Sequence, residues 1–239
     1  MNIILFKESE LDQALARDDP RAVHVLRVIG CQEGDHFDVG LVNGPRGKAR
    51  IVRITEHALE LAFIFGQDIP SLCPVTMLIG LPRPASARRI LKDLTTLGAA
   101  QLHFIATDKG DKSYAQSRLW SQNEYQRLLQ EGAEQAFCTR LPEVGLYGSL
   151  ATALADLPAN TDRLALDNYE ALVSLSQYQF GQRWCVLAVG SERGWSAAER
   201  DLLRGSGFTL ASMGERVLKT ETACIAGLTV VLEKLGCFN

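Results

Sequence analysis

The chain has 239 residues and a formal net charge of -3 at pH 7, and 46% of its residues are hydrophobic. This composition is typical of a folded globular protein and excludes an intrinsically disordered one. The length allows one large domain or two small ones, each with a buried core. The net negative charge gives the protein no overall positive field that would attract nucleic acid, so a surface that binds nucleic acid would have to be a local basic patch.

The six cysteines are spread along the chain without a C-x-x-C pair. Zinc and iron–sulfur sites need clustered ligands, so we predict no metal site. Cys185 and Cys224 lie in apolar runs, as reduced core cysteines do. The apolar run at the N-terminus is too short for a signal peptide, and no stretch approaches the roughly 20 apolar residues of a membrane span. We therefore expect a cytoplasmic protein.

The first 70 residues have the pattern of a small antiparallel sheet or barrel. Runs with strand character lie at 36–39, 49–54 and 59–65, and turn residues separate them. Residues 67–74 contain two prolines and are predicted to be a linker.

After residue 70, predicted strands alternate with predicted helices. The strands are expected at 75–80, 101–106, 163–167, 184–189 and 208–210, and the helices at 86–97, 124–137, 196–205 and 220–235. Ser196 and Glu199 have the spacing of a capping box. The alternation predicts an α/β fold with a parallel sheet that is covered on both faces. The last helix is apolar on nearly every face and needs cover on all sides.

Positive charge is concentrated in the middle of the chain. Residues 71–145 contain 9 basic and 7 acidic side chains, against 8 and 11 in residues 1–70 and 8 and 10 in residues 146–239. The cations concerned are Arg83, Arg88, Arg89, Lys92, Lys109 and Lys112, with Arg46, Lys48, Arg50 and Arg53 nearer the N-terminus. They are either solvated charges or, as a set along one sheet edge, a phosphate-binding surface.

Several nucleotide-binding and hydrolase signatures are absent from the sequence. There is no G-x-x-x-x-G-K-[ST] loop, no G-x-G-x-x-G after a strand, no H-E-x-x-H and no G-x-S-x-G. A Rossmann-type methyltransferase or dehydrogenase is therefore not expected.

Two segments near the C-terminus combine glycines with the start of a helix. Residues 189–196 read V-G-S-E-R-G-W-S, and residues 213–223 read M-G-E-R-V-L-K-T-E-T-A. Glycines let a ligand approach the backbone, and a helix N-terminus offers free N–H groups. Taken singly, each segment is an ordinary loop between a strand and a helix, and taken together they indicate a ligand site.

These two segments resemble the G-P-E-G-G-[FW]-S and L-G-x-R-I-L-R-x-E-T-A signatures of the RsmE family. Its members are the 16S rRNA (uracil-N3)-methyltransferases of the SPOUT superfamily. Further segments that match the family pattern are Leu81–Pro84, Thr95–Ala99, Lys112–Ser113, Glu134–Gln135 and Leu141–Val144, and His24–Arg27 matches it with compressed spacing. The resemblance therefore covers the whole chain.

The resemblance implies two domains and a homodimer. Residues 1–70 would form a PUA-like β-barrel that binds RNA. Residues 71–239 would form a SPOUT methyltransferase domain with a parallel sheet and a deep trefoil knot, which binds S-adenosyl-L-methionine and dimerises. The substrate would be 16S rRNA or the small ribosomal subunit. Because the knot leaves one side of the last helix open, we expect a symmetric dimer through that helix.

The resemblance also implies site residues. Those expected to bind the cofactor are Leu166, Ala188, Val189, Gly190, Glu192, Gly194, Met213, Gly214, Val217 and Leu218. Those expected to bind RNA are His24, Arg27, Arg88, Lys112, Ser113 and Gln135.

The reaction itself indicates which catalytic groups to expect. Transfer from a sulfonium is an in-line displacement, so positioning does much of the work. Uracil N3 becomes nucleophilic only when its proton leaves, and the negative charge then spreads onto O2 and O4. We expect Arg216 to donate to these oxygens. Glu221 either accepts the proton or orients Arg216 and caps the last helix.

The sequence departs from the family pattern at six positions. Ser191 replaces Pro, Arg193 replaces Gly, Cys138 replaces Arg, Thr96 replaces Glu, Glu215 replaces Pro, and Lys219 replaces Arg. Arg193 would be strained if its position required a positive φ. Arg140 is a candidate to replace the arginine absent at Cys138.

Two alternatives differ from the main prediction. The first is a SPOUT methyltransferase that acts on another RNA position, such as a ribose 2'-hydroxyl or a tRNA base. The second is a catalytically lost paralog that binds RNA as a scaffold, which Arg193, Cys138 and the acidic charge balance favour. Calorimetry with S-adenosyl-L-methionine separates the second from an enzyme.

Overall fold

The computed structural model describes residues 2–238, which divide into two compact units. The N-terminal unit contains the chain up to Ser71 together with Ala133–Leu141, and the second contains Leu72–Gly132 and the chain from Pro142 onward. The predicted division at residue 70 did not include the return of residues 133–141 to the first unit. That return depends on long-range contacts, such as the hydrogen bond from the Leu5 amide to Glu134 Oε1 at 3.1 Å.

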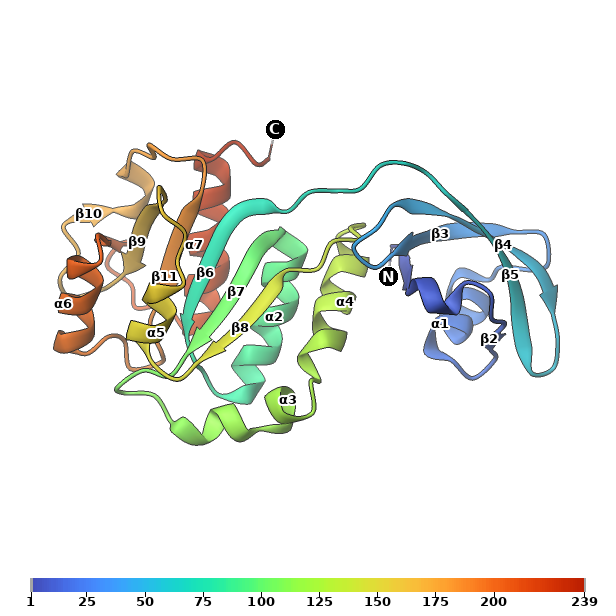
Figure 1. The fold of residues 1–239 in the computed structure, drawn as a ribbon, viewed down its shortest axis with the longest axis horizontal. Helices are drawn as coiled ribbons and strands as arrows, with labels where there is room; N and C mark the ends of the chain where they lie inside the picture. Colours follow the sequence, from blue (N-terminus) through green and yellow to red (C-terminus); the bar gives the residue numbers. More distant parts are fainter. Residues whose placement is uncertain (1, 239) are drawn as a thin grey trace. The chain divides into compact units, whose positions relative to one another are not determined.

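A five-stranded sheet forms the N-terminal unit (Figure 1). Its elements are β1 (Ile4–Phe6), β2 (Leu15–Ala16), α1 (Pro20–Val23), a π-helical turn (His24–Ile29), β3 (His36–Leu41), β4 (Arg46–Ile54) and β5 (Ala58–Phe65). The strand order is β1-β3-β4-β5-β2. β1 and β3 are parallel, whereas the other pairs are antiparallel. The three longer strands follow the predicted alternation, and the short edge strands β1 and β2 were missed.

The second unit contains a seven-stranded sheet with all strands parallel. Its strands are β6 (Cys73–Gly80), β7 (Ala99–Ile105), β8 (Glu143–Tyr147), β9 (Asp162–Leu166), β10 (Val173–Ser174), β11 (Cys185–Val189) and β12 (Thr209–Ser212). The helices are α2 (Pro84–Leu97), α3 (Arg118–Ser121), α4 (Tyr125–Gln135), α5 (Leu150–Ala155), α6 (Ala197–Gly205) and α7 (Thr220–Lys234). The predicted α/β class with a parallel sheet is confirmed.

Several local predictions can be compared with the structure. Ser196 and Glu199 form the predicted capping box at the start of α6. The predicted linker 67–74 was wrong at its end, because Cys73 and Pro74 belong to β6. Proline cannot donate to a strand ladder, and the pairing of β6 with β7 is irregular between Cys73 and Thr76. The elements β8, α3, α5 and β10 were not predicted from the sequence.

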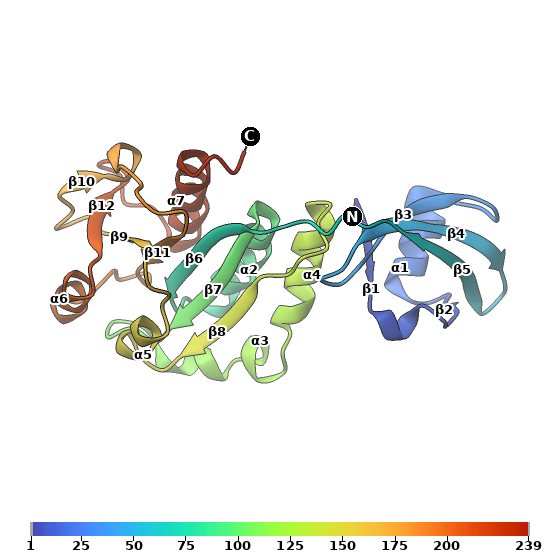
Figure 2. The ribbon, with the colours of Figure 1, turned by 45° about the horizontal axis from the view of Figure 1, so that its top comes forward.

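Helices cover both faces of the parallel sheet (Figures 1 and 2). α5 and α6 contribute to a buried cluster on one face, and α2 and α7 pack against each other on the other face. Gly227 lets α7 lie close to the sheet, since a Cβ there would be 3.1 Å from side-chain atoms of Leu166 and Leu187. No described helix is long and apolar enough to cross a membrane.

Strand order places β11 between β9 and β6. Val189, the last residue of β11, is paired with Leu166 of β9 and with Ile79 of β6. The carboxyl ends of these three strands therefore meet at one edge of the sheet.

Candidate active site

A cavity of about 420 Å³ lies at the carboxyl ends of β9, β11 and β12. Open parallel sheets bind ligands at this edge, where the strand order reverses. The cavity is lined by Arg83, Ser86, residues 166–169, residues 189–195, Ala211, Met213, residues 217–221 and Ala223. Both of the glycine-containing segments that the sequence analysis singled out contribute to this lining.

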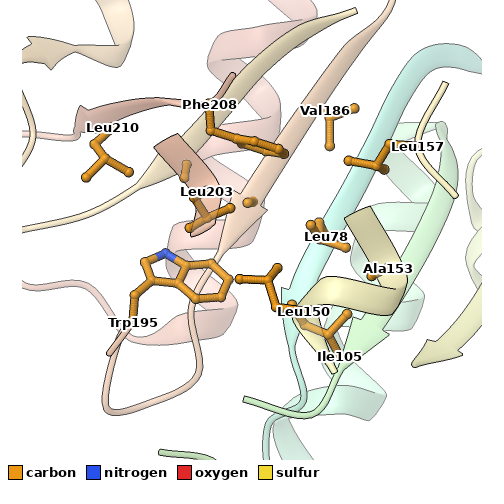
Figure 3. Close-up of a cluster of buried hydrophobic side chains, with 12 residues drawn as sticks. Leu78, Ile105, Leu150, Ala153, Leu157, Val186, Trp195, Leu203, Phe208 and Leu210 are labelled. Carbon is orange, nitrogen blue, oxygen red and sulfur yellow. The ribbon is translucent and has the colours of Figure 1, made fainter. Parts of the chain in front are cut away.

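The loop after β11 is anchored by Trp195, which has no exposed surface. Figure 3 shows the indole pointing into the buried cluster, with Leu150 of α5 beside it. Its Nε1 donates to the Leu166 carbonyl at 3.1 Å, so the loop is tied to the end of β9. Lys109 Nζ donates to the Trp195 carbonyl at 2.8 Å from the loop that follows β7. These bonds fix the loop before any ligand binds.

Glycines allow close backbone approach in this loop. A Cβ at Gly80 would lie 2.3 Å from the Ser191 nitrogen, so only glycine fits where β6 passes the loop. Gly194 has φ +65, and a Cβ built there meets nothing within 4 Å. Arg193 is not among the residues with positive φ, so the glycine-to-arginine departure causes no backbone strain of that kind.

The loop between β12 and α7 is held much less firmly. Gly214 has φ +93 and is exposed, as are Glu215 and Arg216. Val217 is 78% exposed although it lines the cavity. Within residues 2–238, Arg216 has no ion pair or side-chain hydrogen bond.

Glu221 lies in the first turn of α7 and is held by two partners. Its carboxylate accepts a hydrogen bond from Ser86 Oγ at 3.2 Å and lies 3.7 Å from Arg89. The pKa of Glu221 is lowered, chiefly by its own backbone N–H and further by Ser86 and Arg89, against the opposing effect of burial. This lowered pKa makes the Glu221 carboxylate a weaker base than an isolated one. Its partners are Ser86 and Arg89 rather than Arg216.

Asp167 follows β9 on the cavity wall and is buried against Arg200. Burial alone would raise the pKa of Asp167, but the pKa is lowered because the carboxylate accepts from Arg200 Nε at 2.7 Å and from the amides of Tyr169 and Glu170. This carboxylate is therefore ionised and already satisfied. It shapes the turn after β9 at the cavity wall.

The structure brings most of the predicted cofactor residues together. Those on the cavity wall are Leu166, Val189, Gly190, Glu192, Gly194, Met213, Val217 and Leu218. Glu221 lies on the wall as well, whereas Gly214 and Arg216 do not.

Ala188, which was also expected to bind the cofactor, does not line this cavity. It is fully buried in the cluster with Leu150 and Trp195. Successive side chains of a strand point to opposite faces, so Ala188 points away from the side on which Leu187 approaches α7.

The residues predicted to bind RNA are distributed over both units. His24, Arg27 and Gln135 belong to the N-terminal unit. In the second unit, Arg88 pairs with Glu124 at 2.5 Å, and Ser113 donates to Asp111 at 2.7 Å. Lys112 is exposed and lines a second cavity.

Sequence reasoning did not assign Ser86, Asp167, Tyr169, Ser191 or Trp195 to the site. Asp167 is the last residue of a predicted strand and Tyr169 lies two residues beyond it, and their position at a strand end was a usable signal. Ser191 Oγ is buried without a hydrogen-bond partner among the described residues, and Ser191 is 6% exposed. Such a hydroxyl on a cavity wall is available to a polar ligand.

No group of three or more His, Cys, Asp or Glu side chains that could hold a metal ion occurs between residues 2 and 238.

Comparison with known proteins identifies the class. A family model described as an RNA methyltransferase domain matches residues 70–232, so the α/β unit is that of an RNA methyltransferase. A ribosomal RNA small subunit methyltransferase E of Treponema pallidum is 36% identical, with 97% of this chain and 91% of that protein covered. A ribosomal RNA small subunit methyltransferase E 1 of Borreliella burgdorferi is 27% identical, with 98% of this chain and 99% of that protein covered. The chain belongs to the RsmE family.

Solved structures share the fold at low sequence identity. A probable rRNA methyltransferase from Porphyromonas gingivalis has a TM-score of 0.79 at 22% identity and covers 99% of this chain, with 100% of its own chain covered. A ribosomal RNA small subunit methyltransferase E from Neisseria gonorrhoeae, bound to S-adenosyl methionine, has a TM-score of 0.77 at 18% identity, with 98% and 97% covered.

Proposed function

We propose that this chain methylates N3 of a specific uridine in 16S ribosomal RNA, with S-adenosyl-L-methionine as the methyl donor. The enzyme class and the donor follow from membership of the RsmE family: the chain is an S-adenosyl-L-methionine-dependent ribosomal RNA methyltransferase. The choice of a uridine as the target, and of N3 as the methylated atom, is proposed in addition to this enzyme class. One observation supports the proposal most: both signature loops line one cavity at the carboxyl ends of the strands.

The cavity suits the chemistry of the donor. Leu166, Val189, Met213 and Leu218 offer apolar surface for adenine and for the methionine chain. The unpartnered Ser191 hydroxyl offers a hydrogen bond to one of the polar groups of the donor. When bound, S-adenosyl-L-methionine supplies an electrophilic methyl group.

Arg216 and Glu221 have different proposed roles. Arg216 is exposed on the loop formed by residues 213–219 and has no protein partner within the described chain, so its guanidinium is available to uracil O2 or O4. A donor at these oxygens stabilises the charge that appears when N3 loses its proton. Glu221 is proposed to hold the start of α7 through Ser86 and Arg89.

Two measurements test the proposed function. Mass mapping of modified nucleosides in small-subunit rRNA from a deletion strain should show the loss of one 3-methyluridine, which the wild-type gene restores. Loss of a methyl group at a ribose or at a tRNA base would instead favour another RNA position. Calorimetry should detect binding of S-adenosyl-L-methionine, and no heat at millimolar ligand would favour the scaffold alternative.

We also propose the architecture that the family resemblance implies. The N-terminal unit would act as a PUA-like RNA-binding barrel, and the loops around the cavity would form a deep trefoil knot. Supporting observations are the five-stranded sheet of the first unit and the insertion of β11 between β9 and β6.

A symmetric dimer through α7 is part of this proposal. Ile225, Ala226 and Val230 remain partly exposed in the single chain, although α7 is apolar on most faces. Light scattering at micromolar protein should give twice the chain mass. A monomer at that concentration would contradict the dimer.

A further inference from the structure

A second cavity, of about 760 Å³, lies beside the cofactor cavity and is rich in cations. Four of its lining side chains are basic (Arg83, Lys109, Lys112 and Arg193), and two are acidic (Asp111 and Glu192). We refer to these six residues as the cationic cavity. Its formal charge is positive by two, in a chain whose net charge is negative.

The two acids of the cationic cavity are already engaged with the protein. Asp111 accepts hydrogen bonds from the amide of Ser113 at 2.9 Å and from its hydroxyl at 2.7 Å. These two bonds lower the pKa of Asp111, and nearby Arg193 lowers it further. Glu192 accepts from the Arg83 amide at 3.0 Å. Neither carboxylate forms an ion pair with a cation of the cavity among residues 2–238.

The cations, by contrast, are available. Arg83, Lys112 and Arg193 are exposed and have no ion pair in the part of the chain that the structure describes. Lys109 is fixed at the loop by its hydrogen bond to the Trp195 carbonyl. An anion in this cavity would meet several donors without displacing an existing salt bridge.

The two cavities share part of their walls. Arg83, Glu192 and Arg193 line both of them. A group bound among the cations therefore lies next to the ligand in the cofactor cavity. Arg193 is also where this sequence departs from the glycine of the family pattern, so it adds a cation to this shared wall.

We propose that the cationic cavity binds a backbone phosphate of the RNA strand beside the nucleotide to be methylated, and that Arg193 is a substrate-binding residue. Arginine presents a planar fork of donors that matches phosphate oxygens. A phosphate held there would direct the adjoining base toward the neighbouring cavity. This inference rests on the proposed function, because it takes RNA as the substrate.

The test compares Arg193→Gln with a matched control, Arg183→Gln. Arg183 is exposed in the loop before β11 and lines neither cavity, so the control removes the same charge elsewhere. Binding of small-subunit rRNA is measured by fluorescence anisotropy over a series of salt concentrations. Cofactor affinity is measured by calorimetry, and methyl transfer is measured by single turnover at saturating RNA.

We expect Arg193→Gln to weaken RNA binding about fivefold to tenfold and to reduce the salt slope by about one, as loss of one phosphate contact does. Arg193→Lys should recover part of the affinity. Arg183→Gln should leave the RNA affinity, the salt slope, the cofactor affinity and the single-turnover rate at their wild-type values.

Wild-type RNA affinity and salt slope in Arg193→Gln would overturn the phosphate site, whatever the activity of the wild-type protein. An equal loss in Arg183→Gln would also overturn it, because the effect would then be general. If the wild-type chain binds rRNA and transfers no methyl group, the proposed function fails, and the comparison of the two variants still decides the phosphate site.

Discussion

The two loops that line the cavity at the carboxyl ends of β9, β11 and β12 differ in how the rest of the chain holds them. Residues 190–196 are fixed by the buried Trp195, by its bond to the Leu166 carbonyl and by Lys109. Residues 213–219 have a glycine at φ +93, an exposed Arg216 and a Val217 that is 78% exposed. One loop is held in place before binding, whereas the other has few contacts of its own.

This difference predicts different binding roles for the two loops. A loop that is already ordered loses little entropy when a ligand binds, so it suits the cofactor. A loop with an exposed cation and an exposed valine has surface left for the RNA substrate or for a second copy of the chain. The following predictions test this contrast, starting with the largest expected effect.

Trp195→Ala should remove the side chain that anchors the loop formed by residues 190–196. Replacing a fully buried tryptophan by alanine costs about 3–5 kcal/mol, and we expect the free energy of unfolding to fall by that amount in urea denaturation. Trp195→Phe is the control, because it keeps much of the packing and loses the bond to the Leu166 carbonyl, worth about 1 kcal/mol. A fall below 1 kcal/mol in Trp195→Ala would mean that the loop is not anchored there.

Arg216→Ala, in the loop formed by residues 213–219, should slow the chemical step. Loss of a donor that stabilises developing charge lowers a rate by roughly 10²–10³, and we expect that loss in single-turnover methylation with normal cofactor affinity. Arg216→Lys should rescue the rate only in part, because an ammonium lacks the planar fork. If Arg216 binds phosphate instead, Arg216→Ala will bind RNA more weakly with a near-normal rate at saturating RNA.

Gly194→Val should weaken cofactor binding at least tenfold, or about 1.4 kcal/mol, and leave the oligomeric state unchanged. A Cβ at Gly194 meets no protein atom within 4 Å, so the added side chain has the cavity to occupy. Gly194→Ala has the same unfavourable positive φ and adds less volume, which makes it the control. Equal losses of affinity in the two variants would attribute the effect to backbone shape rather than to contact with the ligand.

Glu221→Gln should have the smallest effect, on stability. The pKa of Glu221 is lowered in the folded chain, so its contribution is present above the unfolded pKa and is lost as the pH falls through the folded pKa. At a helix N-terminus we expect about 0.3–1 kcal/mol at pH 7. Urea denaturation should show this difference at pH 7, and it should vanish in acid. Loss of the acidic limb in the pH–rate profile of Glu221→Gln would instead show that Glu221 accepts the proton.

The sequence predicted only part of the contrast between the two loops. Their glycines, the capping box at Ser196 and the start of the last helix are local features, and the sequence predicted them. The anchoring of Trp195 was not predicted, because its partners are Leu166, Lys109 and the cluster around Leu150. These residues lie far away in the sequence and come together only in the folded sheet.

The sequence by itself determined the alternation of strands and helices, because hydrophobic periodicity and capping residues act locally. The tertiary structure alone decided which of these residues face the cavity. Val189 lines it and Ala188 does not, since neighbouring side chains on β11 point to opposite faces and only packing defines which face holds the cavity. The order of the strands likewise brings Arg83 next to Arg193, because β6 and β11 are neighbours in the sheet although more than 100 residues separate them in the chain.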